Sequence, residues 1–157
     1  MALDPDHPSR GSLAVLLIAQ MAFGLLAMTV CLPSMQEWGA IFGASPGAVQ
    51  MTFSGYVLTY GSLQLLYGPL SDRHGRRLLL LVGLALCGAA ALAGALASDI
   101  RSLIGARVLQ GAGAAACMVV GRAALQDLFE GPERTRMMAY VGMAMGLCPP
   151  LGTVVGG

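Results

Sequence analysis

The most informative group of residues in this chain lies at residues 68–77, which hold one aspartate, three arginines and two glycines. Asp72 and Arg76 are separated by four residues, a spacing at which a carboxylate and a guanidinium form an ion pair along one helix face. Gly75 can adopt the backbone angles of a tight turn, and Gly68 would let two helices cross closely. The group therefore predicts charge pairing at a sharp turn between helices.

Long apolar stretches flank this group, since residues 51–67 before it and 78–97 after it contain no charged side chain. A short basic turn between two such stretches is typical of a loop between membrane-spanning helices. A loop that only sets the orientation of the helices is the simpler interpretation. It explains the arginines but gives no role to Asp72 or to the glycines.

A second charge, Arg107, lies inside an apolar stretch, about one helical turn from its beginning. An arginine costs about 2.5–3.5 kcal/mol at the centre of a membrane helix and less near its end. Its side chain either reaches the membrane surface or provides a fixed positive charge in a cavity, where it pairs with an acid or an anionic ligand. Gln110 follows one turn later on the same face, and Gly111 removes bulk where helices approach.

Four polar side chains, Tyr56, Tyr60, Gln64 and Tyr67, follow one another at intervals of four, four and three residues and so share one helix face. Their polar groups either bond across to a neighbouring helix or line an aqueous path for a substrate. The sequence leaves both interpretations open.

The composition indicates that lipid surrounds most of the chain, because 56% of its residues are hydrophobic and only 11% are charged, against about 25% charged in soluble domains. Its four cysteines stand singly in apolar segments and are expected to pack as small apolar residues, with no disulfide and no metal site. No nucleotide-binding loop and no nucleophile–base pairing is present. We therefore expect no enzyme, no cofactor and no nucleic-acid partner.

The chain contains apolar segments that are each close to the roughly 20 residues needed to cross a bilayer. After a tail at residues 1–11, they cover residues 12–33, 46–67, 78–97, 103–124 and 137–157. The sequence thus predicts an all-α membrane protein with five spans. The last of these is expected to bend at Pro149 and Pro150 and to pack closely through Gly152, Gly156 and Gly157. Because it ends within an apolar segment, we expect an amino-terminal fragment.

The arginines predict the orientation of the spans. Most lie on the same side as the amino terminus, namely Arg10, Arg73, Arg76, Arg77, Arg122, Arg134 and Arg136. Basic residues accumulate on the cytoplasmic side of membrane proteins. The amino terminus is therefore expected to be cytoplasmic.

Residues 68–77 resemble, at every fixed position, the signature loop between the second and third helices of major facilitator superfamily transporters. The resemblance implies the first five helices of a twelve-helix bundle. It also implies that Asp72 and Arg76 form a latch that closes the cytoplasmic face against a helix of the carboxy-terminal half. Asp127, at the end of the fourth span, is placed to complete an acid–arginine–acid relay.

Two further motifs support this resemblance. Residues 107–113 are similar to the Arg-x-x-Gln-Gly-x-Gly pattern of the superfamily's fourth helix, which implies a role for Arg107 and Gln110 in coupling and substrate binding. Residues 152–157 partly resemble the antiporter motif, which ends Gly-Pro-x-x-Gly-Gly, but Thr153 replaces its proline. A close-packed helix is still expected, whereas antiport is less well supported.

Finer similarity points to the Bcr/CflA drug-resistance branch and is carried by Leu32-Pro33, Gln50-Met51-Thr52, residues 64–69 and residues 134–138. It implies multidrug efflux across the bacterial inner membrane by alternating access, coupled to protons in the full-length protein. The implied partners are the lipid bilayer, a drug-like small molecule, protons and the missing carboxy-terminal half.

One departure from the branch concerns Thr29, which stands where branch members have an aspartate. No aspartate or glutamate lies well inside any predicted span, so a usual proton-binding acid is missing from this part. We therefore assign Thr29 to the substrate and coupling region together with Arg107.

Two alternatives remain open. A small multi-span protein could build a transport path as a homodimer, or it could be a membrane scaffold without transport activity. Asp72 argues against both, because the latch needs a partner helix that this chain does not contain.

Overall fold

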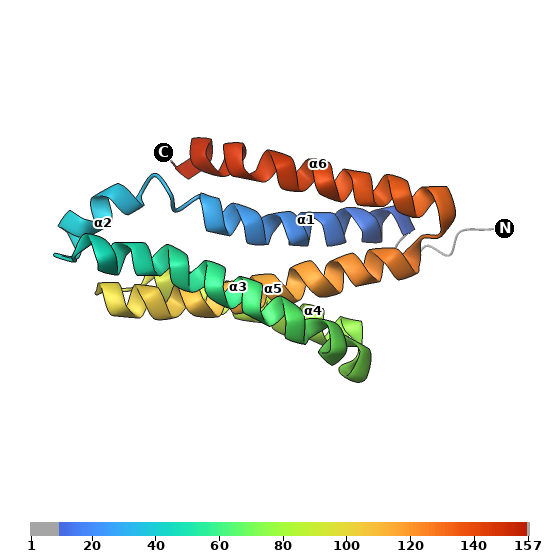
Figure 1. Ribbon diagram of the computed structural model, residues 1–157, viewed down its shortest axis with the longest axis horizontal. Coiled ribbons are helices and arrows are strands. Elements are labelled where there is room, and N and C mark those ends of the chain that lie inside the picture. Colours follow the sequence, from blue (N-terminus) through green and yellow to red (C-terminus); the bar gives the residue numbers. More distant parts are fainter. Residues whose placement is uncertain (1–9, 157) are drawn as a thin grey trace.

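The computed structural model describes residues 10–156, and within them it is built of α-helices without a strand. Five long helices lie roughly along one another, and a short one, α2, lies at one end of the bundle (Figure 1). The helices are α1 (Arg10–Thr29), α2 (Met35–Ile41), α3 (Pro46–His74), α4 (Arg76–Ala95), α5 (Ile100–Leu128) and α6 (Gly131–Gly156). The predicted all-α architecture is confirmed. Of the predicted tail, only Arg10 and Gly11 are described, and they begin α1.

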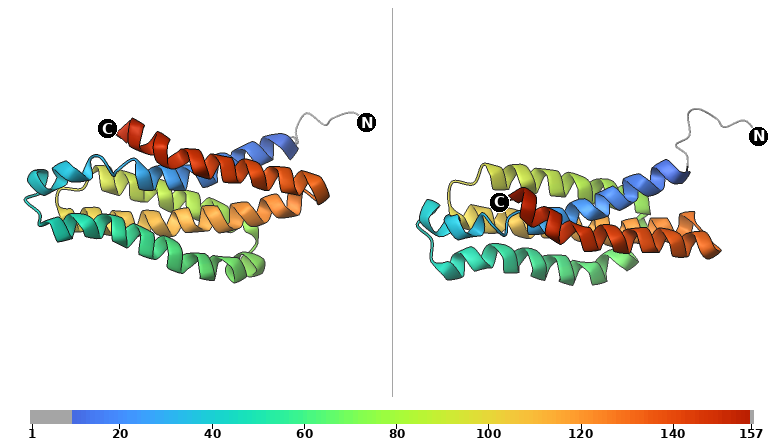
Figure 2. Two further views of the ribbon diagram at one scale, coloured as in Figure 1. Left: turned by 45° about the horizontal axis from the view of Figure 1, so that its top comes forward. Right: turned by 90° about the horizontal axis from the view of Figure 1, so that it is seen from above.

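Four of the long helices, α1, α4, α5 and α6, are long and apolar enough to cross a membrane. The fifth long helix, α3, has 29 residues but is not among them, because polar residues such as Tyr56, Tyr60 and Gln64 interrupt its apolar sequence. It lies alongside the others in every view (Figure 2). A membrane crossing by α3 thus remains a prediction.

The first helix ends earlier than expected, at Thr29 rather than Pro33. The amide of Leu32 bonds to the Thr29 carbonyl at 3.1 Å, which tightens the chain into a turn. Pro33 also disfavours a helical conformation in the residue before it. Of the last four carbonyl groups of α1, those of Leu26 and Thr29 accept bonds from the Val30 and Leu32 amides just past the helix, which leaves the Ala27 and Met28 carbonyls for other donors.

Side-chain caps mark the starts of α3 and α5. Pro46 opens α3, where the Ser45 hydroxyl accepts a bond from the Ala48 amide at 3.3 Å. The Asp99 carboxylate accepts from the amides of Arg101 and Ser102 at the start of α5, at 2.8 and 2.9 Å. The Ser102 amide holds the pKa of Asp99 below its usual value, so this cap is lost only on acidification.

Gly75 joins α3 to α4 as a single residue with φ +85°, so the expected tight turn is present. The close helix crossing expected at Gly68 is not found among residues 10–156. A Cβ atom added at Gly68 would meet no atom within 4 Å.

Helix α5 forms the centre of the bundle and packs against α1, α3 and α4. Small residues make this possible, as the sequence predicted for Gly111. A Cβ atom there would lie 2.5 Å from the Tyr56 carbonyl oxygen of α3, and one at Gly113 would lie 2.6 Å from the Gly83 oxygen of α4. Larger side chains would push these helices apart.

Helix α6 packs against α1 through Gly152, which meets Thr29, and Gly156, which meets Val30. The bend expected at Pro149 and Pro150 stays a prediction, because α6 is helical through both residues and a helix can bend without ending. Proline fixes φ at a value that a helix accepts, so the helix loses two amide donors without ending. Gly157 lies outside the described residues.

Candidate functional site

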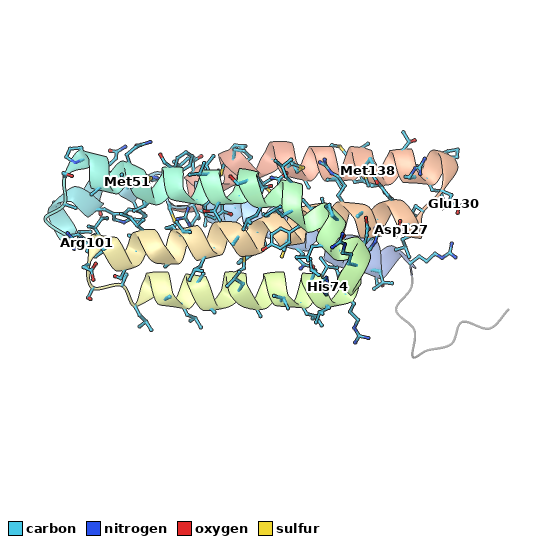
Figure 3. All side chains as sticks on the ribbon, turned by 60° about the horizontal axis from the view of Figure 1, so that its bottom comes forward. Met51, His74, Arg101, Asp127, Glu130 and Met138 are labelled. Carbon is cyan, nitrogen blue, oxygen red and sulfur yellow. The ribbon has the colours of Figure 1, made fainter. Side chains whose placement is uncertain are left out.

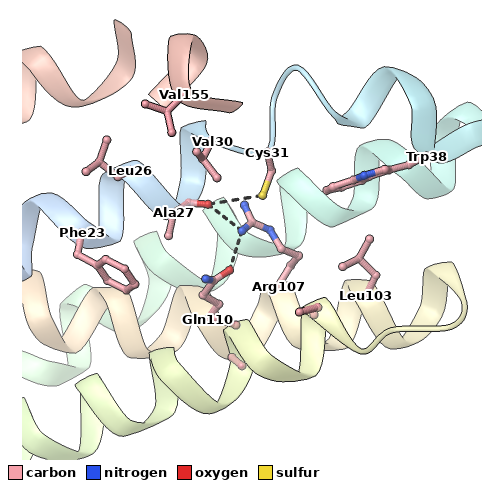
Figure 4. Close-up of a pocket in the computed structure, with 14 residues that line it drawn as sticks. Phe23, Leu26, Ala27, Val30, Cys31, Trp38, Leu103, Arg107, Gln110 and Val155 are labelled. Atoms are coloured by element: carbon pink, nitrogen blue, oxygen red, sulfur yellow. Dashed lines mark hydrogen bonds between the residues drawn. The ribbon is translucent and has the colours of Figure 1, made fainter. Parts of the chain in front are cut away.

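Arg107 is buried in the interior of the bundle, with only 4% of its surface exposed. Its Nη1 atom donates to the Ala27 carbonyl at 2.8 Å and to the Gln110 Oε1 atom at 2.6 Å. Its Nη2 atom lies 3.5 Å from the Met28 carbonyl. Figure 4 shows the guanidinium pointing from α5 towards the end of α1. This burial favours the interpretation of Arg107 as a fixed charge inside the bundle over one in which it reaches the membrane surface.

The end of α1 supplies the counter-charge for Arg107. Ala27 and Met28 belong to the last turn of α1, where carbonyl oxygens lack amide partners and the helix dipole gives a partial negative charge. The guanidinium carbon also lies 4.6 Å from the centre of the Tyr56 ring, a cation–π contact. Arg107 is thus a side-chain cap on α1 that forms no ion pair with an acid among residues 10–156.

A cavity of about 490 Å³ opens beside this cap. Most of its walls are apolar, and their residues are Phe23, Leu26, Ala27, Val30, Cys31, Trp38, Ala90, Ala91, Gly94, Ala95, Leu103 and Val155, with Arg107 and Gln110 as the polar members from α5. The Nε atom of Arg107 is buried and has no hydrogen-bond partner among the described residues. The site therefore combines an apolar volume with an unused donor.

The polar residues of α3 have different surroundings. The Tyr56 hydroxyl donates to the Gly24 carbonyl of α1 at 2.7 Å, and its ring stacks on Tyr60 at 6.1 Å. This supports the packing interpretation for Tyr56. Tyr60 and Gln64 are half-buried, and neither lines the cavity beside Arg107.

The turn between α3 and α4 is tied to the end of α5. The Arg76 Nη1 atom lies 2.8 Å from the Asp127 Oδ2 atom, whereas its Nη2 atom lies 3.9 Å from the Asp72 Oδ1 atom. The structure thus brings together the three charged residues of the predicted relay. His74 and Asp127 lie at one end of the bundle and Arg101 at the other (Figure 3).

The sequence profile of the family described as Major Facilitator Superfamily matches residues 13–157. The chain belongs to this superfamily. Relatives with 34% identity include multidrug resistance protein D of Escherichia coli, over 93% of this chain and 37% of the relative, and the chloramphenicol resistance protein of Pseudomonas aeruginosa, over 94% and 36%. The puromycin resistance protein pur8 of Streptomyces alboniger is 35% identical over 98% of this chain and 30% of its own length.

The chain spans about a third of the length of these relatives. Together with its apolar helices, the family match identifies a multi-pass membrane protein with the fold of a major facilitator. The Arg107 site and the Asp72–Arg76–Asp127 cluster are therefore parts of a facilitator bundle.

Thr29 does not join Arg107 in this facilitator bundle, contrary to the sequence-based assignment. It is 3% exposed, donates from Oγ1 to the Leu25 carbonyl at 3.1 Å and faces Gly152 of α6. It is not among the residues that line the cavity. The reason is geometric, since the Thr29 side chain packs against Gly152 of α6, whereas the cavity is lined by other residues of α1, by α2, α4 and α5, and by Val155 of α6.

Sequence reasoning missed the backbone carbonyls of Ala27 and Met28 as partners of Arg107. No side-chain type marks such a site. The usable signal is Pro33, which predicts that α1 ends early and leaves carbonyls unpaired.

Proposed function

We propose that this chain is part of a facilitator-type multidrug exporter of the Bcr/CflA branch, which works by alternating access. The observation that carries the proposal is the cavity beside Arg107, which has apolar walls and a buried unpaired donor. Drug-binding pockets typically have about 300–1,000 Å³ and a few placed polar groups. The names of the relatives, which include multidrug, chloramphenicol and puromycin resistance proteins, support export of this class of compound.

The chemistry of the cavity favours a substrate class. Arg107 offers N–H donors, and no aspartate or glutamate is among the lining residues. A cation would find no charge partner there, whereas a neutral or anionic compound with a carbonyl or phenolic oxygen would find a donor. We infer that the substrates are apolar molecules with a hydrogen-bond acceptor.

Proton coupling is part of the proposal, although its acid lies elsewhere. The acids among residues 10–156 are Glu37, Asp72, Asp99, Asp127, Glu130 and Glu133, and none of them is among the residues that line the Arg107 cavity. We infer that the residue that binds the proton belongs to the remaining part of the full-length protein.

Transport is tested with the full-length protein in bacteria that lack their own exporters. We expect lower accumulation of chloramphenicol and puromycin, and restored accumulation when a protonophore collapses the proton gradient. Drug accumulation that stays the same when the protonophore is added would contradict proton coupling. Accumulation equal to that of cells with an empty vector would contradict export.

For the orientation, we propose an inner-membrane protein with a cytoplasmic amino terminus. The arginine-rich end that contains His74 and Asp127 would then face the cytoplasm. Cysteine labelling with a reagent that does not cross membranes should modify Ser98→Cys in intact cells and leave Glu133→Cys unmodified. The reverse pattern would contradict this orientation.

The cluster of Arg76, Asp72 and Asp127 is proposed as the cytoplasmic latch. The side chains of Asp72 and Asp127 are 72% and 60% exposed, so their pairing within this chain contributes about 0–1 kcal/mol. Asp72 is the less tightly held acid, at 3.9 Å, and is free to contact another helix. This predicts separate roles for the two acids.

Asp72→Asn in the full-length protein is therefore expected to cut efflux while insertion and stability are unchanged. Asp127→Asn is the matched control, since it breaks the 2.8 Å pair with Arg76. It should loosen the turn and lower the melting temperature more than Asp72→Asn does. Normal efflux by Asp72→Asn at normal expression would mean that the turn between α3 and α4 only sets the orientation of the helices.

A further inference from the structure

Two thiols that the proposed transport step does not use lie together where α4 crosses α5. Cys87 of α4 and Cys117 of α5 are both buried, with 1% and 2% of their surfaces exposed. A Cβ atom at Gly113 would lie 3.1 Å from the Cys87 sulfur, and one at Gly83 would lie 3.4 Å from the Cys117 sulfur. The glycine pair thus brings the two helices, and with them both sulfurs, to one place.

Hydrogen bonds orient the two sulfurs. The Cys87 thiol donates to the Gln110 carbonyl of α5 at 3.4 Å. The Gln20 side chain of α1 donates to the Cys117 sulfur at 3.3 Å. Both thiols are fixed on packed helices, so a ligand that binds both would cost little side-chain conformational entropy.

Two cavities lie near the thiol pair, and both are lined by neighbours of the two cysteines rather than by the cysteines themselves. One of about 380 Å³ is lined by Gly83 and Ala116, which are neighbours of the crossing on α4 and α5. The cavity beside Arg107 includes Gln110, whose carbonyl accepts from Cys87. A small apolar reagent dissolved in the membrane can therefore approach the crossing closely.

We propose that Cys87 and Cys117 form a dithiol site that captures bidentate thiophilic electrophiles, with trivalent organoarsenicals as the fitting class. An arsenoso compound, R–As=O, would react with the two thiols to give R–As(S–Cys)₂ and water. Two S–H bonds and the As=O bond break, two As–S bonds form, and the two thiol protons leave on the oxygen. No oxidant is needed, and sulfur is the soft ligand that such an electrophile prefers.

Bidentate capture has a distinct signature. Once one As–S bond has formed, the second thiol reacts within the same molecule, which raises affinity by about 100-fold or more. Only a competing dithiol reverses such binding readily. A single thiol would not.

The test treats the purified full-length protein with phenylarsine oxide and measures its intact mass. We expect a gain of one arsenical less one water per chain, and protection of Cys87 and Cys117 from alkylation after denaturation. A small dithiol should remove the adduct, whereas a monothiol at the same concentration should not. No adduct, or removal by the monothiol, would overturn the proposal.

Matched variants locate the site. Cys87→Ala and Cys117→Ala should each weaken capture by about 100-fold or more, whereas Cys31→Ala and Cys148→Ala should leave it unchanged. Cys87→Ser, which keeps the side-chain size, replaces the alanine variant if that variant elutes as an aggregate. Equal capture by Cys87→Ser and the parent protein would place the reaction at other cysteines.

Discussion

Replacing Arg107 by alanine is expected to abolish export by the full-length protein while leaving it inserted in the membrane. The substitution removes the hydrogen bonds from Arg107 to the Ala27 carbonyl and to Gln110, at 2.8 and 2.6 Å, and the cation–π contact with Tyr56. An unsatisfied buried acceptor costs about 1–3 kcal/mol. Removing an arginine from the membrane interior regains about 2.5–3.5 kcal/mol. These terms are similar in size, so the bundle should persist.

Export is lost for a local reason. Without Arg107, the last turn of α1 has no cap and the cavity has no positive donor beside Gln110. The α1 wall of the cavity then loses its support. The cavity also loses the group that would donate to a substrate acceptor. Minimal inhibitory concentrations of chloramphenicol, measured in cells with matched amounts of membrane-inserted protein, are expected to fall to those of cells without the exporter.

Arg107→Lys is the matched control. Lysine keeps the charge but lacks the planar fork that reaches the Ala27 carbonyl and Gln110 together. Partial export is expected, with weaker affinity for substrate. If Arg107→Ala exports normally, the cavity beside it is not the substrate site.

Much of this fold follows from the sequence, because apolar length and helix-ending residues act locally. Gly75 predicts the turn between α3 and α4, where φ is +85°. The spacing of Asp72 and Arg76 predicts one ion pair, and the family resemblance adds Asp127 to it. Gly111 marks the close crossing of α3 and α5, since only a residue without a side chain fits against the Tyr56 backbone.

The site itself was predicted less completely, because it depends on which way side chains point from α1. Thr29 and Met28 are neighbours in the chain, yet the side chain of Thr29 faces α6 whereas the Met28 carbonyl faces Arg107. Sequence position alone does not separate these directions.

Thr29→Asp is expected to disrupt the bundle and, with it, export of every compound. Thr29 lies against Gly152, where a Cβ atom would already meet its Oγ1 atom. A carboxylate there would stand between α1 and α6, next to the Leu25 carbonyl and the negative end of the α1 dipole. An ionised aspartate costs about 2.5–3.5 kcal/mol inside a membrane helix, which reduces the packed population by about 100-fold.

The measurement is the amount of folded full-length protein in the membrane, by fluorescence-detected size exclusion, together with resistance to cationic and neutral drugs. Thr29→Ser is the matched control, because it keeps the hydroxyl that donates to Leu25, and it should behave as the parent protein. Gly152→Ala should lower the folded amount, and Thr29→Ala should partly restore it, since removing Oγ1 relieves one of the contacts. A folded Thr29→Asp protein that exports cations would contradict this assignment, because its carboxylate would have to reach the cavity beside Arg107 rather than the face of α6.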